Sequence, residues 1–330
     1  MIADISRVNI GDKVIFYVQA TKDNPGRFFG VFKVVSNPFF DENNSKNYLR
    51  NKLKMGLSFR VKIDADSVYP EGISEHDYLD SLKGKSHPYD LCWSLIYRKL
   101  KGNRGCTMIM DYEYNDFLIM LQAKNVHNSI ISPPFTYENN RIVHSKKALL
   151  YSPDPTKNNP QLNIDILPRL QYLFSQKNKS FETHLQAYII QNLNKTQLSN
   201  LLIPYKKLEY WIGNEVSCGV GMQRIDLMIK QETQTDIVIR LIELKDEAPR
   251  DNVLKQINWY LEWLSDYVVP KYNRKRIRVI PTIIANGGLS PQVLTVYRTS
   301  QYNIPNVNVV PLQYIGFNIN QNTISFTRYL

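Results

Sequence analysis

Three ionisable residues interrupt two apolar stretches between positions 224 and 247, and they are the strongest candidates for chemistry in this chain. The segment reads RIDLMIKQETQTDIVIRLIELKDE, which has the composition of two strands joined by a polar turn. Asp226, Glu243 and Lys245 stand at positions that should face a core. An unpaired charge in a core costs several kcal/mol, comparable to the stability of a whole domain. These side chains therefore either form a structural ion-pair network or bind a ligand.

Side-chain alternation along a strand places these groups together. Glu243 and Lys245 are two residues apart and share one face. A hairpin with the four-residue loop TQTD sets residue 232 opposite residue 237, and the same register sets Asp226 opposite Glu243. The Cβ atoms of opposed residues lie roughly 5 Å apart, so two carboxylates repel unless a cation lies between them. Oxygen ligands on a rigid sheet suit Mg²⁺. Lys245 beside them can orient or help deprotonate a water, or stabilise developing negative charge.

The composition favours a two-domain chain with a polyanionic partner. The 330 residues suffice for two domains, and hydrophobic residues make up 43% of them. No run approaches the roughly 20 apolar residues of a membrane span, and the N-terminus lacks a signal-peptide pattern. We therefore expect a cytoplasmic protein without a membrane partner. A net charge of +11 with 21 Tyr and 4 Trp favours nucleic acid, although a solvated basic surface gives the same numbers.

The cysteines argue against a zinc site or a disulfide framework. Cys92, Cys106 and Cys218 are scattered along the chain and form no C-x-x-C pair. We expect them to be reduced, small residues of the core.

Composition along the chain divides it into three regions. Residues 1–127 alternate strand-like and helical patterns, residues 128–165 have the Pro, Asn and Ser content of a linker, and residues 166–330 have a regular order. This last region is predicted to run helix, three strands, helix, strand, helix, strand. The predicted elements span 180–193, 208–217, 221–230, 236–245, 251–268, 278–286, 290–302 and 306–319. Ser180 and Ser290 are the expected N-caps of the first and third of these helices.

The first region is predicted to contain three long strands and several helices. The strands span 12–20, 27–36 and 57–69, and a shorter strand spans 104–110. The helices span 74–82, 88–100 and 115–124, with Ser74 as the N-cap of the first.

The charged motif and the order of elements resemble the PD-(D/E)xK nuclease superfamily. Asp226 and the run Glu243-Leu244-Lys245 match its motif, with Ile225 in place of the proline. The resemblance implies a C-terminal restriction-endonuclease-like α/β domain with a central mixed sheet, and hydrolysis of phosphodiester bonds. It also implies Mg²⁺, for which Mn²⁺ can substitute, held by Asp226, Glu243 and the main-chain carbonyl of Leu244. Lys245 would serve the attacking water.

Two helical residues extend the resemblance toward the branch of archaeal mismatch endonucleases and RecB-like nucleases. Glu182 matches a helical Glu that approaches the metals, and Gln256 matches a Gln on the helix after the motif lysine. The resemblance therefore adds Glu182 and Gln256 to the catalytic set. A Glu in the first turn of a helix is also ordinary helix-dipole and capping chemistry, so a structural role stays open for both.

Five basic residues are candidates for contacts with DNA phosphates. Arg224 starts the motif strand, where it either contacts phosphate or neutralises the acids. The run KYNRKRIR between a helix and a strand adds Lys271, Arg274, Lys275 and Arg276. Such a run can follow a phosphate backbone, and it can equally be a solvated loop.

The first region resembles the EVE and YTH branch of PUA-like domains. The resemblance rests on GDKVIFYVQATKDNPGRFFGVFKVVSNPFFDEN followed by SFRVKID. It implies an α+β barrel that reads a modified base flipped into an aromatic pocket. The candidate walls of this pocket are Tyr17, Phe28, Trp93 and Tyr97. Aromatic residues also supply most core area, so a core role stays open for each.

A reader domain joined to a nuclease domain suggests a restriction-type DNA endonuclease that depends on, or is sensitive to, modified bases. One alternative is a repair endonuclease acting on mismatched or branched DNA. Another is a catalytically inactive nucleic-acid binding protein, against which the intact Asp226, Glu243 and Lys245 argue. Cleavage of both strands of double-stranded DNA would need a homodimer or sequential nicking.

Overall fold

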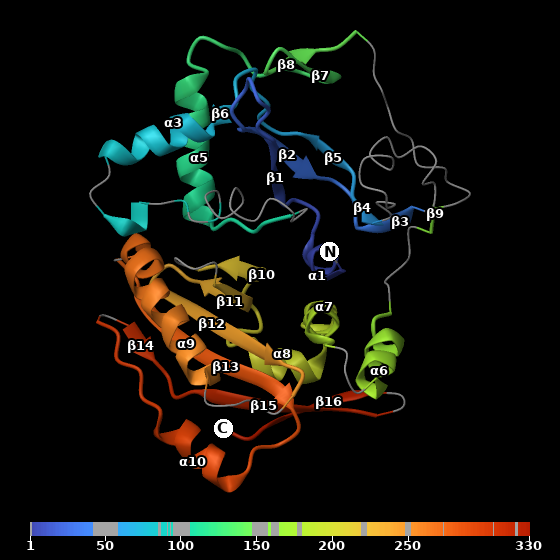
Figure 1. Ribbon diagram of the computed structural model, residues 1–330, viewed down its shortest axis with the longest axis vertical. Coiled ribbons are helices and arrows are strands. Elements are labelled where there is room, and N and C mark those ends of the chain that lie inside the picture. Colours follow the sequence, from blue (N-terminus) through green and yellow to red (C-terminus); the bar gives the residue numbers. More distant parts are fainter. Residues whose placement is uncertain are drawn as a thin grey trace. The chain divides into compact units, whose positions relative to one another are not determined.

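The computed structural model describes residues 2–41, 59–84, 87–90, 92, 94, 106–146, 158–159, 165–176, 180–218, 223–247, 252–272, 274–305, 307–320 and 323–330. The chain forms two compact units (Figure 1). The larger unit comprises Met1–Arg7, His87–Met110 and Asp165–Leu330. The smaller unit comprises Val8–Ser86 and Asp111–Ile164.

The smaller unit contains a four-stranded antiparallel sheet. Strand β2 (Arg27–Val34) is central and pairs with β1 (Lys13–Val18), β5 (Ile63–Ala65) and β6 (Ile73–Ser74). Phe29, Val68 and Ile142 form its buried core. A second small sheet pairs β3 (Phe39–Asp41) with β4 (Phe59–Arg60) and β9 (Asn158–Asn159).

Two helices accompany these sheets. Helix α3 (Glu75–Ser81) begins at Ser74, whose side chain accepts a hydrogen bond from the Asp77 N–H while the Asp77 carboxylate accepts one from the Ser74 N–H. This reciprocal capping box confirms the predicted N-cap. Helix α3 leads into the short helix η2 (Leu82–Gly84), and α5 (Asp111–Lys124) covers the expected helix at 115–124.

The structure corrects three expectations for this part of the chain. The strand predicted over 57–69 is broken into β4 and β5, which belong to different sheets. Residues 106–110 have no regular strand. Most of the helix predicted over 88–100 lies outside the described residues, and its described start, Pro88–Asp90, forms the short helix η3. The linker predicted over 128–165 contains the hairpin β7 (Phe135–Glu138) and β8 (Arg141–His144).

The hairpin has a local cause. Asn139 and Asn140 connect its strands with φ angles of 50° and 61°. Asn tolerates this left-handed region, and two such residues make the turn that suits a two-residue hairpin. The two Asn residues in this segment therefore indicate a hairpin turn and not a linker.

The larger unit is built on a seven-stranded mixed sheet with the order β10-β11-β12-β13-β15-β16, and β14 pairs beside β13. The β12–β13, β13–β14 and β13–β15 pairs are parallel, and the others are antiparallel. The strands are β10 (Trp211–Ser217), β11 (Arg224–Glu232), β12 (Asp236–Lys245), β13 (Arg276–Asn286), β14 (Val307–Val309), β15 (Gln313–Ile319) and β16 (Ile324–Arg328).

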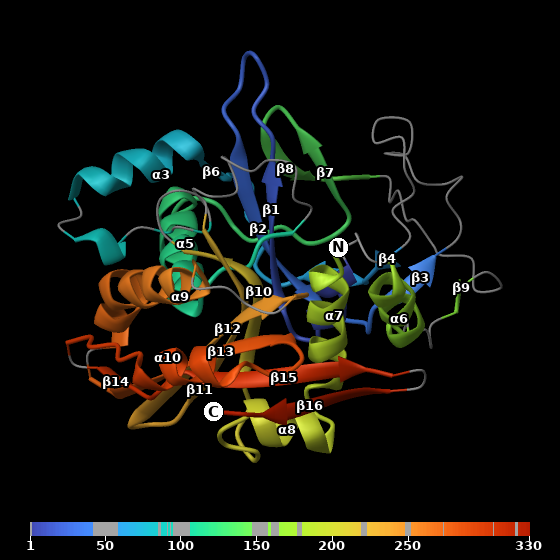
Figure 2. The same ribbon diagram turned by 60° about the horizontal axis from the view of Figure 1, so that its bottom comes forward.

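Helices cover both faces of this sheet. Helix α7 (Glu182–Asn192) buries Leu185 and Ile189 in the same core cluster as Leu227 and Ile242 of the sheet. Helix α8 (Thr196–Leu202) contributes to that cluster too. Helix α9 (Asn252–Trp263) lies on the opposite side of the sheet from α8 (Figure 2). It continues through the π-helix η4 (Leu264–Val268) into η5 (Val269–Tyr272).

The predicted order of this region is confirmed in its main elements, with several differences. Helix α10 (Pro291–Thr299) begins at Ser290 as expected, but Phe181 rather than Ser180 is the N-cap of α7, without a side-chain hydrogen bond. The strand predicted over 306–319 is two strands, β14 and β15, because the first pairing with β13 ends at Val309 and the second begins at Gln313. Helix α6 (Leu167–Ser175), helix α8 and strand β16 were not predicted.

The N-terminal helix α1 (Ile2–Arg7) belongs to the larger unit, whereas residues 1–127 were expected to form one domain. Buried polar contacts explain the difference. Arg7 Nε donates to Asn214 Oδ1 at 2.7 Å, and Asn214 Nδ2 lies 2.9 Å from Asp4 Oδ1. Asn214 Nδ2 also lies 3.4 Å from Gln186 Oε1 on α7. Arg7 and Asp4 are about two hundred residues from Asn214 in sequence, so no local pattern could show these contacts.

Within the described residues, no helix combines the length and apolar character needed to cross a bilayer.

We expect Asn214→Ala to destabilise the larger unit by about 1–3 kcal/mol, because the substitution removes the hydrogen bonds that Asn214 makes with the buried side chains of Arg7 and Gln186. Urea unfolding would measure the loss. The matched control is Asn318→Ala on the exposed side of β15, which should change stability by less than about 0.5 kcal/mol. Equal stability of the two variants would contradict a structural role for the α1 contacts.

Candidate active site

The register of β11 and β12 brings the two predicted acids together. Glu232 pairs with Ile237 and Leu227 pairs with Ile242, so the next position along the hairpin sets Asp226 against Glu243. The predicted register is therefore confirmed. Leu227 and Ile242 point into the core cluster under α7. By alternation, Asp226 and Glu243 point to the other face, which α9 covers.

Each acid accepts hydrogen bonds that fix its orientation. The Leu244 N–H donates to Asp226 Oδ2 at 2.7 Å. Lys245 Nζ donates to Glu243 Oε1 at 2.6 Å, and the Tyr260 hydroxyl lies 2.7 Å from Glu243 Oε2. The Glu243 side chain is almost completely buried, with 3% of its surface exposed. The two carboxylates are thus held in place rather than solvated.

The surroundings of Asp226 make its negative charge costly. The residue as a whole retains some exposed surface, but protein atoms surround its carboxylate group. Burial raises the pKa of Asp226 well above its usual range, and the charge of Glu243 raises it further. The hydrogen bond from Leu244 lowers the pKa but does not cancel these effects. A cation between the two acids would remove the conflict.

Lys245 supplies the positive charge of the site. Its burial alone would lower the pKa of its ammonium group, but the charge of Glu243 and the hydrogen bond to it outweigh this effect. Asp226 and Glu182 contribute in the same direction, so the pKa of Lys245 is raised. Lys245 is therefore a protonated donor at neutral pH. Of the roles expected for it, charge stabilisation and orientation of water suit this state better than proton abstraction.

Glu182 lies within the electrostatic field of the same groups. It is the first residue of α7, where a carboxylate is favoured by the helix dipole. Burial raises the pKa of Glu182, the charge of Lys245 lowers it, and the charges of Asp246 and Glu243 raise it. The Asp246 N–H donates a hydrogen bond to it. The structure thus brings Glu182 beside the motif residues, as expected.

Within the described ranges, no three His, Cys, Asp or Glu side chains gather as a metal-binding cluster. The predicted metal ligands include only two such side chains, Asp226 and Glu243. The third predicted ligand is the main-chain carbonyl oxygen of Leu244. Glu182 is accordingly a neighbour of this set rather than a third carboxylate ligand.

Helix α9 contributes two polar side chains from one face. Gln256 and Tyr260 are four residues apart and therefore neighbours on the helix surface. Gln256 Oε1 is buried and has no hydrogen-bond partner in the described part of the chain. Buried polar atoms are nearly always satisfied, so an unsatisfied oxygen on this face marks a place for a water or a ligand group.

Tyr260 is the site residue to which the sequence analysis gave no role. Its hydroxyl lies 2.7 Å from Glu243 Oε2 and 2.8 Å from the Arg224 carbonyl oxygen. Burial, then the charges of Glu243 and Asp226, raise the pKa of Tyr260, so it remains a donor. The sequence did contain one indication of this role. Tyr260 follows Gln256 by four residues on the predicted helix and therefore lies on the same helix face.

Most of the predicted phosphate contacts have acidic partners. Arg224 was expected either to contact phosphate or to neutralise an acid, and it pairs with Glu215. Ion pairs join Arg224 to Glu215, Lys271 to Asp90, Lys275 to Glu232 and Arg276 to Asp236. Arg274 alone among the five predicted residues has no ion pair in the described ranges. The run is therefore not a continuous uncompensated positive surface.

Two of the predicted pocket aromatics pack on each other in the smaller unit. The rings of Tyr17 and Phe28 lie 4.8 Å apart between centroids, and Phe28 also meets Phe117 edge-on at 6.4 Å. Phe28 is 5% exposed, which is a core position. The Tyr17 hydroxyl donates to Glu75. Trp93 and Tyr97 lie outside the described residues.

All three cysteines are free thiols, as expected. Cys92 and Cys218 are buried as predicted, whereas Cys106 is exposed and its predicted core position is wrong. Burial raises the pKa of Cys218 far above its usual range, and the nearby charge of Glu243 adds to this effect. Cys218 is thus an inert thiol of the core.

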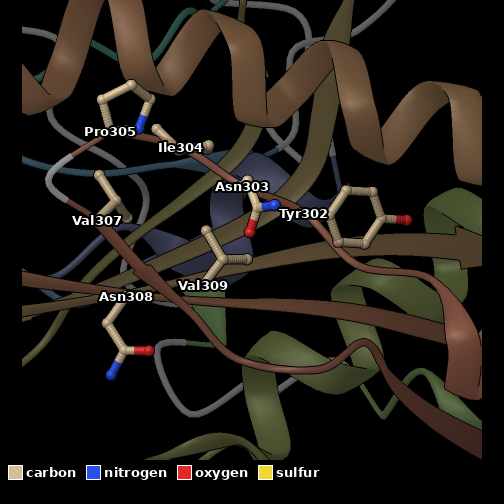
Figure 3. A pocket seen from close by; sticks show the side chains of 7 residues that line it. All are labelled: Tyr302, Asn303, Ile304, Pro305, Val307, Asn308 and Val309. Carbon is tan, nitrogen blue, oxygen red and sulfur yellow. The ribbon is translucent and has the colours of Figure 1, made fainter.

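An open pocket of about 530 Å³ lies beside β14 (Figure 3). Its lining consists of Tyr302, Asn303, Ile304, Pro305, Val307, Asn308 and Val309. None of these side chains is acidic or basic, and none belongs to the predicted site. The carboxylate pair therefore remains the candidate active site.

No family model matches this chain, and comparison with curated proteins and with solved structures finds no match either.

The raised pKa of Asp226 predicts a pH-dependent stability. An acid whose pKa is higher in the folded state costs no stability at low pH and destabilises the fold as pH rises through its folded pKa. In EDTA, Asp226→Asn should therefore be more stable than the parent at pH 7.5, and the difference should shrink toward pH 4. Urea unfolding at both values measures it.

Asp266→Asn, on an exposed part of η4, is the matched control and should give no such difference at either pH. An Asp226→Asn variant less stable than the parent at pH 7.5 would show that the carboxylate is a favourable structural charge.

Proposed function

We propose that this chain is a Mg²⁺-dependent endonuclease that hydrolyses phosphodiester bonds in double-stranded DNA. The observation that carries the proposal is the facing pair of Asp226 and Glu243 on adjacent strands, with Lys245 bonded to the second acid. A structural ion-pair network would give each carboxylate its own cation. Within the described residues a single lysine serves two acids, which leaves negative charge uncompensated.

The donor set fits a hard divalent cation. Asp226, Glu243 and the Leu244 carbonyl would hold Mg²⁺, or Mn²⁺ in its place, and all three offer oxygen ligands. The burial and the charge of Glu243 that raise the pKa of Asp226 favour a cation beside this carboxylate. Gln256 Oε1, one helical turn from Tyr260, is a further buried oxygen without a hydrogen-bond partner in the described residues. When bound, such an ion polarises a phosphoryl oxygen and makes water more acidic.

The residues of this chain then have distinct tasks. Tyr260 and Lys245 hold the two oxygens of Glu243, so this carboxylate keeps one orientation. The protonated ammonium group of Lys245 lies at the edge of the site. There it can orient an attacking water and stabilise the negative charge that develops on the phosphoryl oxygens. Glu182 adds a further acid at the same edge.

Double-stranded DNA is the proposed substrate because the chain carries a net charge of +11 and because of the superfamily resemblance. The resemblance of the smaller unit to base-reading domains supports a restriction-type activity that depends on modified bases. Cleavage of both strands would require a homodimer or two successive nicks.

We expect Lys245→Ala to lower the single-turnover rate of plasmid cleavage by roughly 10²–10³-fold, the effect of removing one charge-stabilising donor. DNA affinity should change little, because the lysine acts on the reacting groups. Glu243→Gln should abolish cleavage as well, and EDTA should stop the parent.

The matched controls are Lys255→Ala and Glu262→Gln on the exposed surface of α9, which should cleave like the parent. Full activity in Lys245→Ala or Glu243→Gln would rule out the assigned site. A defect confined to binding would reduce Lys245 to a phosphate contact.

The substrate can be settled with matched duplexes. We expect faster cleavage of DNA carrying methylated or hydroxymethylated cytosine, or methylated adenine, than of plain DNA of the same sequence. A flipped base held by aromatic stacking gains about 1–3 kcal/mol, so the preference should be about 5- to 150-fold. A preference for mismatched or branched DNA, with no effect of modification, would replace the restriction proposal by repair.

A further inference from the structure

One strand of the larger unit carries a buried cation on the face away from the carboxylate pair. Arg240 lies in the middle of β12 and is 4% exposed. It pairs in register with Ile229 of β11, a residue of the core cluster that α7 and α8 cover. Alternation therefore places Arg240 on the opposite face from Glu243.

The partners of Arg240 are all neutral. Its Nε donates to the Leu202 carbonyl at 2.8 Å, and its Nη1 lies 2.8 Å from Thr282 Oγ1 and 2.8 Å from Gln313 Oε1. Its Nη2 makes no hydrogen bond in the described part of the chain. Buried arginines are ordinarily paired with carboxylates, so this environment leaves a full positive charge uncompensated.

Two further arginines share this face. Arg328 of β16 is opposite Ile315, which belongs to the same core cluster, and its Nη2 donates to the Leu201 carbonyl at 2.6 Å. Arg278 of β13 is the register partner of Val238, two residues before Arg240. Arg278 is exposed and forms no ion pair within the described ranges.

The neighbouring strand confirms the direction of Arg278. Asn308 of β14 pairs with Arg278, and neighbouring residues of parallel strands in register point the same way. Figure 3 shows Asn308 pointing away from Val307 and Val309. Arg278 therefore points to the sheet face opposite Val307 and Val309, which by its register with Val238 is the face of Arg240.

The charges of Arg278 and Arg328 act on the guanidinium group of Arg240. Burial, then the charges of Arg328 and Arg278, lower the pKa of Arg240 to about 9. No carboxylate opposes this effect. The acid nearest in register, Asp236, is engaged by Arg276 through two contacts of 2.7 Å and 3.0 Å. The carbonyl oxygens at the C-terminal end of α8 carry only about half a negative charge in total, which does not balance the full positive charge of Arg240.

We propose that Arg240, Arg278 and Arg328 form a binding site for a phosphate group on the sheet face opposite Asp226 and Glu243. Guanidinium groups bind phosphate through paired hydrogen bonds. A doubly charged anion matches three guanidinium groups better than a carboxylate does. The phosphate belongs either to a small phosphate ester or to the backbone of DNA, and the site does not depend on the proposed nuclease activity.

The test measures binding in EDTA, which keeps divalent cations away from the carboxylate pair. The probes are inorganic phosphate, adenosine 5′-monophosphate and a 20-base-pair duplex, each titrated at constant ionic strength against chloride. Arg278→Ala is the principal variant because Arg278 has no structural partner in the described residues, so the fold should be retained. Arg328→Ala is the second variant, and Arg298→Ala on the exposed side of α10 is the matched control.

We expect the parent and Arg298→Ala to bind a probe equally, and Arg278→Ala and Arg328→Ala to bind it at least tenfold more weakly. If the two variants bind the two small probes more weakly, the ligand of the site is a small phosphate ester. If they bind only the duplex more weakly, and the salt dependence of duplex binding falls by about one counterion, the ligand is the DNA backbone. Binding by neither class of probe, or equal binding by all four proteins, overturns the proposal. The binding test does not measure cleavage. If the chain binds phosphate at this site but fails the cleavage test, only the proposed nuclease function is refuted.

Discussion

The larger unit is organised around the repulsion between two carboxylates that the β11–β12 register forces together. Asp226 and Glu243 cannot both be charged and buried without compensation, and neither can move, because each is part of a central strand. The Leu244 N–H, Lys245 and Tyr260 each neutralise or orient one oxygen. Strands β11 and β12, helix α9 and the start of α7 thus meet at a pair of acids whose repulsion destabilises the fold. Such destabilising groups are characteristic of sites that bind a ligand.

Strand β12 separates opposite charges by alternation alone. Its odd-numbered residues Glu243 and Lys245 belong to the face with α9, and its even-numbered Arg240 belongs to the face with α8. One strand therefore presents an acid-rich site on one side of the sheet and a guanidinium cluster on the other. Ile242 and Leu244, which are also even-numbered, share the face of Arg240 and belong to its apolar core cluster.

Local patterns predicted the parts of this structure that depend on neighbours in sequence. The loop TQTD fixed the hairpin register and therefore the facing of Asp226 and Glu243, and Ser74 and Ser290 marked two helix starts. Long-range contacts decided the rest. The pairing of the basic residues with distant acids, the hydroxyl of Tyr260 on Glu243, and the attachment of α1 through Asn214 all join residues whose proximity no spacing rule reveals. The hairpin at Asn139 is the exception, since its turn signal was local and was assigned to a linker.

The alternation of the chain between the two units sets the order in which they can form during synthesis. All segments of the smaller unit have been translated once residue 164 is added, so that unit can fold while the larger one is still incomplete. Helix α1 must wait for α7 and β10, its partner Asn214 being 207 residues beyond Arg7. The carboxylate pair follows later still, on strands that end at Lys245. A nascent chain therefore carries a complete smaller unit well before it carries the facing pair of Asp226 and Glu243.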